Sequence, residues 1–175
     1  MLLIAMTYAS VQQQFLGNVE ACLQQAEAAI QLAERYGFTL WLSMAKFLRG
    51  WSHTRLNAFD AGFAEMQESI TLFRSTGAEL GAAYFAGLLA ETLVLNHQPD
   101  LGLLALGEAF DLLERAQDRW CEAELYRIKA LVFQHYAARI EDESLAEEVH
   151  VALEMAQQVA EAQGAQQWAA RLTSV

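Results

Sequence analysis

The organisation of the chain is clearest in residues 77–124, which read GAELGAAYFAGLLAETLVLNHQPDLGLLALGEAFDLLERAQDRWCEAE. This stretch predicts two helices joined by a short turn. The segment from Asn96 to Pro99 interrupts the first helix, and Pro99 lies where a helix best accepts proline, in the first turn of the next helix. The second helix carries apolar residues at the spacing of one helix face, at Leu103, Leu106, Phe110 and Leu113. The stretch is therefore predicted to form an antiparallel helical hairpin.

This hairpin recurs along the chain with an offset of forty residues. The offset aligns Ile30, Ile70 and Phe110; Leu32, Leu72 and Leu112; Glu20, Asp60 and Asp100; and Gly37, Gly77 and Gln117. A period shared by three copies indicates a stacked array of repeats. We predict repeats over residues 1–37, 38–77, 78–117 and 118–164, the last lengthened by an acidic interruption, and a partial repeat over 165–175.

The composition favours helix throughout the chain. Of its 175 residues 54% are hydrophobic, mainly alanine and leucine, and only one is proline. We predict an all-α protein of about seven to nine helices in a single domain, 1–175. The expected helices cover 2–14, 19–36, 38–56, 59–76, 78–95, a segment beginning at 99, 119–139 and 144–163. Ser144 and Glu147 have the spacing of a capping box for the last of these, although the acidic segment 141–143 would also suit a helix N-terminus.

Each copy contains three small residues at a recurring spacing. The second residue lies twelve positions after the first, and the third lies seven positions after the second. The sets are Ser10, Cys22 and Ala29; Gly50, Gly62 and Ser69; Ala90, Gly102 and Ala109; and, across the interruption, Ala130, Val149 and Ala156. Since small side chains let two helix backbones approach closely, these positions predict where hairpins close and dock. The spacing resembles that of tetratricopeptide repeats, which are about 34 residues long. The resemblance implies a right-handed solenoid of antiparallel helical hairpins, a tetratricopeptide-like superhelix.

A second resemblance covers residues 93–127 and, more loosely, 161–171. The order of residues that carries it is Pro99, Leu103, Leu106, Ala109, Trp120, Glu122, Glu124, Arg127, Gly164 and Arg171. It resembles the helical repeat arm at the C-terminus of large bacterial proteins that join a signalling ATPase to an adenylate or guanylate cyclase domain or to a DNA-binding regulator. The sequence departs from that pattern at Gln117, where glycine is usual, and in its shortened final helix. The resemblance implies an arm whose catalytic domains lie outside this chain.

Charge and cysteine content narrow the expected partners and the cellular compartment. The 22 acidic residues outnumber 11 scattered basic ones, for a net charge of −11, which disfavours nucleic acid as a partner. Cys22 and Cys121 form no C-x-x-C pair, so we expect two packed thiols in a reducing, cytoplasmic compartment. The apolar opening MLLIAM is too short to cross a membrane and has no basic flank, so neither a signal peptide nor a membrane partner is expected.

Few residues are arranged for chemistry. Glu147 and His150 form an E-x-x-H pair, the spacing found in di-iron bundles, but a second such pair is missing, so a surface histidine is the favoured interpretation. Glu122 and Glu124 point to different faces of a helix, which makes them a poor acid–base pair. No nucleotide-binding loop or nucleophile motif is present. We therefore expect a protein that is not an enzyme and holds no cofactor or metal.

The expected function is a non-catalytic helical-repeat scaffold for protein–protein interaction or self-association, with the regulatory arm of a cyclase or ATPase as the alternative. The first helices of successive hairpins would line a groove for a protein or peptide partner. The groove residues would be Met44, Phe47, Trp51, Arg55, Tyr84, Glu91, Glu124, Arg127, Leu131 and His135. Alternatively, Trp51 and Tyr84 fill the hairpin cores. We also expect Trp168 and Leu172, on an unfinished final helix, to form a self-association face that supports a homodimer.

Overall fold

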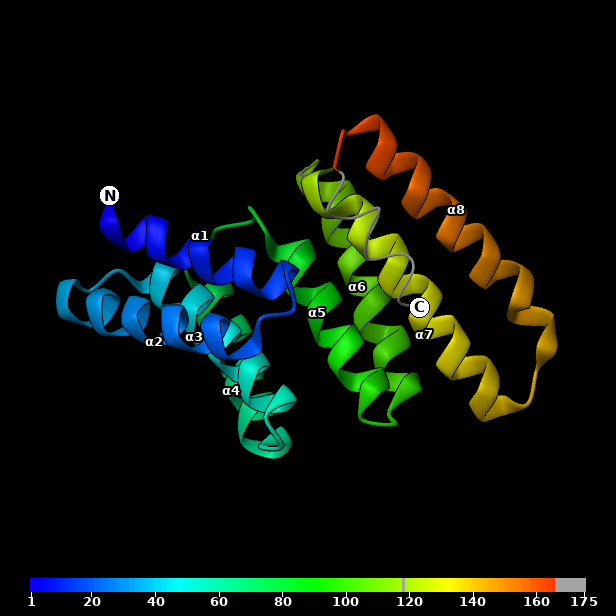
Figure 1. Ribbon diagram of the computed structural model, residues 1–175, viewed down its shortest axis with the longest axis horizontal. Coiled ribbons are helices and arrows are strands. Elements are labelled where there is room, and N and C mark those ends of the chain that lie inside the picture. Colours follow the sequence, from blue (N-terminus) through cyan, green and yellow to red (C-terminus); the bar gives the residue numbers. More distant parts are fainter. Residues whose placement is uncertain (118, 166–175) are drawn as a thin grey trace. The chain divides into compact units, whose positions relative to one another are not determined.

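The computed structural model describes residues 1–117 and 119–165, and all regular secondary structure in this part of the chain is helical (Figure 1). The helices are α1 (Leu2–Phe15), α2 (Val19–Tyr36), α3 (Thr39–Arg55), α4 (Phe59–Ser75), α5 (Ala82–Leu95), α6 (Pro99–Ala116), α7 (Glu122–Ile140) and α8 (Ala146–Ala162). Short 3₁₀ turns precede α7 and α8, at Arg119–Cys121 and Glu143–Leu145. The all-α prediction is confirmed.

Three helix starts differ from the prediction by more than one residue, each for a local reason. Helix α5 begins at Ala82, because Gly81 takes a φ of 81° in the left-handed region. The 3₁₀ turn before α7 delays that helix to Glu122. The capping box predicted from Ser144 does not form: the Asp142 side chain accepts a 2.9 Å hydrogen bond from the Ser144 backbone N–H, and α8 has no side-chain cap. A carboxylate two residues ahead of an N–H is well placed for this local bond.

The turns inside successive hairpins repeat the forty-residue period in their backbone geometry. Gly17, Asn57 and His97 all have positive φ, at 71°, 65° and 59°. In each turn the N–H of the next residue donates to the carbonyl five residues earlier, with N···O distances of 2.9, 3.0 and 3.0 Å. This is the bond that closes a Schellman motif, which ends a helix at a left-handed residue. Gln117, which stands where Gly37 and Gly77 occur in earlier copies, is also left-handed, with a φ of 54°.

Close helix crossings lie where small residues predicted them. A Cβ built on Gly50 would lie 2.6 Å from the Gly62 carbonyl oxygen, and one built on Gly62 would lie 2.5 Å from that of Gly50. A Cβ on Gly102 would lie 3.2 Å from the Ala90 carbonyl oxygen. In the first hairpin, the Ser10 hydroxyl donates to the Cys22 carbonyl over 3.0 Å. Small residues thus lie at these crossings, and α1 contacts α2, α3 contacts α4 and α5 contacts α6.

The chain divides into two compact units. The first unit, Met1–Ala78, contains α1 to α4, and its boundary lies next to the predicted repeat boundary at residue 77. Within it α2 packs between α1 and α3, and α4 pairs with α3 (Figure 1). One core cluster joins α1, α2 and α3 through Leu3, Ala29, Ile30, Ala33 and Ala45.

The second unit, Glu79–Val175, contains α5 to α8. Helix α7 contacts α5, α6 and α8, so it is the central element of this unit (Figure 1). Its core cluster combines Ala90 and Val94 of α5 and Leu106 of α6 with Ile128 and Val132 of α7. The face of α7 that carries Ile128 and Val132 is therefore enclosed by α5 and α6.

Candidate functional site

Three predicted groove residues meet inside the second unit as a buried ion triad, Glu91, Glu124 and Arg127. Helix α7 supplies Glu124 and Arg127, which lie one turn apart on the same face. The Arg127 guanidinium donates to both Glu124 carboxylate oxygens, from Nε over 2.9 Å and from Nη2 over 2.8 Å. Its Nη2 also donates to Oε1 of Glu91, on α5. The triad thus joins α5 to α7 by charge-assisted hydrogen bonds.

The triad is almost completely removed from solvent. Glu124, Arg127 and Glu91 are 1%, 4% and 5% exposed. Burial disfavours the charged guanidinium, but the adjacent carboxylates of Glu91 and Glu124 outweigh it and raise the pKa of Arg127 above its usual value. The guanidinium therefore stays charged and cannot serve as a general base. This arrangement is suited to fixing helix positions, and it does not present a proton donor or acceptor to a substrate.

The remaining predicted groove residues of the second unit are enclosed to different degrees. Tyr84 is 1% exposed, and its ring lies 5.1 Å from that of Trp120, centroid to centroid. Leu131 packs on the core cluster of α5, α6 and α7, and His135 is half-buried. Tyr84 fills the interior, in agreement with the alternative interpretation of that residue.

The predicted groove residues of the first unit are also buried or half-buried. Met44, Phe47 and Trp51 are 8%, 1% and 4% exposed. Arg55 is half-buried, and its guanidinium carbon lies 5.5 Å from the centre of the Trp51 ring, at the distance of a cation–π contact. A groove that presents Trp51 and Tyr84 to a partner does not agree with this burial. The sequence pattern locates the apolar and small positions, but it cannot distinguish a groove wall from an interior.

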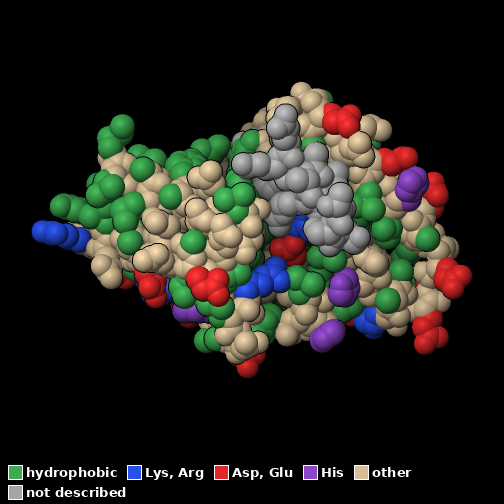
Figure 2. All heavy atoms as spheres, in the orientation of Figure 1, with side chains coloured by type: hydrophobic (Ala, Val, Ile, Leu, Met, Phe, Trp, Pro, Cys, Tyr) green, Lys and Arg blue, Asp and Glu red, His purple; other side chains and the backbone are tan. Residues whose placement is uncertain are grey.

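The predicted self-association face, Trp168 and Leu172, lies outside the described residues. Instead, the structure exposes an apolar surface on α1 that sequence reasoning did not single out. Leu2, Ile4 and Tyr8 are 66%, 38% and 48% exposed, and Ala5 is exposed between them. Hydrophobic side chains gather at the N-terminal end of α1, at the upper left of Figure 2. We call these four residues the α1 outer face.

The α1 outer face is unusual because the same helix also buries its opposite side. Leu3 and Val11 are 5% and 6% exposed, and Thr7 and Ser10 are fully buried. A helix that is apolar on both sides is normally enclosed on both sides. The signal for this surface in the sequence is the uncharged apolar run MLLIAM.

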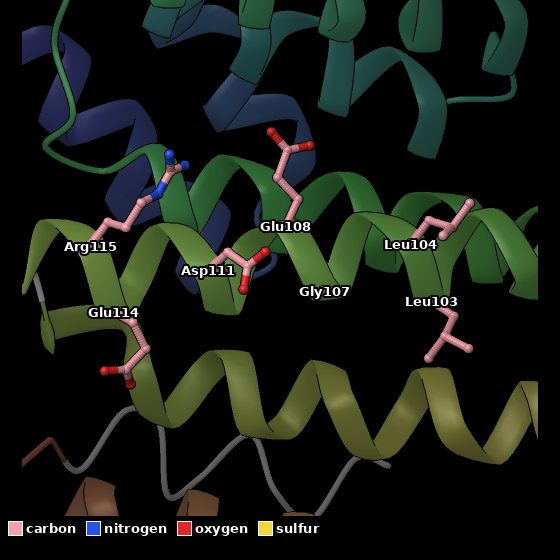
Figure 3. Close-up of a pocket in the computed structure, with 7 residues that line it drawn as sticks. All are labelled: Leu103, Leu104, Gly107, Glu108, Asp111, Glu114 and Arg115. Carbon is pink, nitrogen blue, oxygen red and sulfur yellow. The ribbon is translucent and has the colours of Figure 1, made fainter.

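A shallow concavity of about 690 Å³ follows the outer side of α6 (Figure 3). Leu103 and Leu104 lie at one end of it, and Glu114 and Arg115 at the other. The Glu114 carboxylate accepts a 2.8 Å hydrogen bond from Arg119. The described residues that line this concavity all belong to α6, so they border it on one side only.

His150 Nε2 lies 3.2 Å from Glu154 Oε1 in an exposed pair one turn apart, as a surface histidine would. Within residues 1–117 and 119–165, no group of three or more His, Cys, Asp or Glu side chains is arranged to hold a metal ion. Within the same residues, no helix has the length and apolar character needed to span a bilayer.

Comparison with protein-family profiles, characterised proteins and solved structures finds no match to this chain.

Proposed function

We propose that this chain is a non-catalytic helical-repeat module that mediates protein–protein interaction, including self-association. In this proposal its hairpins stack as a right-handed, tetratricopeptide-like solenoid. The recurring left-handed turns at Gly17, Asn57 and His97 support a stacked array, because identical closures give successive hairpins the same geometry.

The observation that carries the interaction role is the uncovered α1 outer face. Exposed apolar surface on a soluble chain costs free energy, and contiguous apolar patches are characteristic of binding surfaces. The ion triad supports the non-catalytic part of the proposal, because its charged groups are engaged with one another and buried. A helix of complementary shape is the expected ligand, since apolar helix faces are recognised by other amphipathic helices.

Selection from a displayed library of amphipathic helical peptides tests this function. The parent chain should enrich peptides with one apolar stripe, and the Leu2→Glu/Ala5→Glu variant should lose them. Leu104→Glu is the matched control, because Leu104 is an equally exposed leucine, at 71%, on α6. A library that yields no consensus, or one that the α1 variant and the control retain equally, would contradict the proposal.

A further inference from the structure

We infer that the α1 outer face is an interface between two copies of this chain, in which α1 pairs in antiparallel orientation with α1 of the second copy. This inference rests on the proposed function and names the partner of the same surface. The contact is symmetric, so both copies use the same residues.

The internal repeat indicates that a helix is the natural occupant of this face. Forty residues after Leu2 and Ala5, Leu42 and Ala45 occupy the equivalent positions on α3. There Ala45 is fully buried in a cluster formed mainly by α2, with Leu3 of α1, and Leu42 packs against the same cluster. The equivalent surface of α3 is thus covered by a helix, whereas in the single chain that of α1 is open to solvent.

Charge favours a second copy of α1 over other contacts between copies. Helix α1 contains no Asp, Glu, Lys, Arg or His, in a chain with a net charge of −11. The exposed sides of α2, α4, α6 and α8 all carry carboxylates, for example Glu20, Asp60, Asp111 and Glu154. Two copies that met through those helices would place like charges together, while an α1 pair brings no charged side chain of either helix into the contact.

The order of residues on α1 also fits its own antiparallel image. When the two-fold axis passes beside Ala5, Leu2 of each copy lies opposite Tyr8 of the other, because the two positions are equally distant from the axis. The small Ala5 side chain at the centre lets the two backbones approach closely. The Tyr8 ring already rests against Trp41, with centroids 6.0 Å apart, so it is held in place before the copies meet.

A contact limited to one helix face is small, so the dimer should be weak and reversible, with a dissociation constant on the order of 10 µM. Analytical ultracentrifugation of the parent, Ala5→Glu and Leu104→Glu chains, over a concentration series around that value, measures it. Ala5→Glu places two carboxylates at the two-fold axis and should weaken dimerisation at least about tenfold, while Leu104→Glu should leave it unchanged. Circular dichroism melts establish that each variant is folded.

Disulfide trapping tests the orientation. The native Cys22 and Cys121 are fully buried, so an introduced surface cysteine reports on the interface alone. Ala5→Cys should crosslink two copies readily. In the antiparallel pair the two copies of residue 12 lie about 21 Å apart along the axis, too far for a disulfide, so Gln12→Cys should not crosslink.

Each result decides the matter. Equal crosslinking through Ala5→Cys and Gln12→Cys would overturn the antiparallel pair, and equal effects of Ala5→Glu and Leu104→Glu would overturn the interface. A parent chain that is monomeric throughout the series would overturn the inference. If that monomer still selected α1-dependent helical peptides, the proposed function would stand, whereas failure of both experiments would reject the two together.

Discussion

The buried ion triad makes the most demanding prediction about the stability of the second unit. Arg127→Met keeps much of the side-chain volume but removes the guanidinium that Glu91 and Glu124 share. Removing one partner from a buried charge network typically costs about 3–5 kcal/mol. Because the three side chains are at most 7% exposed, solvent can replace little of the lost interaction, so we expect the variant to lose at least about 3 kcal/mol of stability at pH 7.

The pH dependence identifies the cause of this loss. Without Arg127, burial and mutual repulsion should raise the pKa of both carboxyl groups above the usual value of about 4.3. The folded variant would then bind protons more readily than its unfolded state. Its deficit relative to the parent should therefore be largest at neutral pH and shrink as the pH falls, by up to about 1.4 kcal/mol per pH unit for each proton taken up.

Urea unfolding followed by circular dichroism, at several pH values, measures the effect. Arg49→Met is the matched control: Arg49 also bonds a carboxylate, that of Glu65, with its Nε 2.9 Å from Oε1, but its side chain is 30% exposed. This control should cost about 1 kcal/mol or less. Adding Glu91→Gln to Arg127→Met should restore part of the stability. If the loss of stability is no larger than that of the control, or does not depend on pH, the conclusion that charge holds the triad together is refuted.

Three further predictions concern packing, turns and thiols. Gly62→Ala places a Cβ 2.5 Å from a carbonyl oxygen of α3 and should lower the free energy of unfolding, measured with urea, by about 2 kcal/mol. Gly107→Ala, whose added methyl group lies in open space, should raise it by about 0.5–1 kcal/mol. Equal effects of the two substitutions would contradict the close crossing. His97→Gly should stabilise by about 1 kcal/mol, because φ is 59°, and a loss would show that the imidazole contributes more than the strain. Cys22 and Cys121 should react with a thiol reagent only on unfolding, since both are fully buried and burial raises the pKa of the Cys22 thiol; rapid labelling of the native chain would disprove this.

Much of the local structure was predictable. Helix α2 has the expected bounds, and Gly37 ends it in the left-handed region, which glycine adopts without strain. The small residues at Gly50, Gly62 and Gly102 marked real crossings, because a missing side chain has few other uses in the middle of a helix. The capping box predicted at Ser144 does not form, because Asp142 caps a short 3₁₀ turn that contains Ser144, and α8 begins only after this turn.

The candidate site was predictable only in part. Glu124 and Arg127 share a face by their spacing, so their proximity could be expected from the sequence. Glu91 is 36 residues from Arg127, and its arrival at the same guanidinium depends on how α5 packs against α7. The apolar residues of α1 were visible in the sequence, but their exposure was not.

The sequence by itself determined the helices, their turns and the forty-residue repeat, because these depend on backbone preferences and on neighbours within a few residues. Only the tertiary structure decided which apolar and charged side chains are enclosed. Trp51 and Leu2 are both large apolar residues on predicted helices, yet one is 4% exposed and the other 66%. Burial depends on which surfaces other helices cover, and that depends on contacts between residues far apart in the chain.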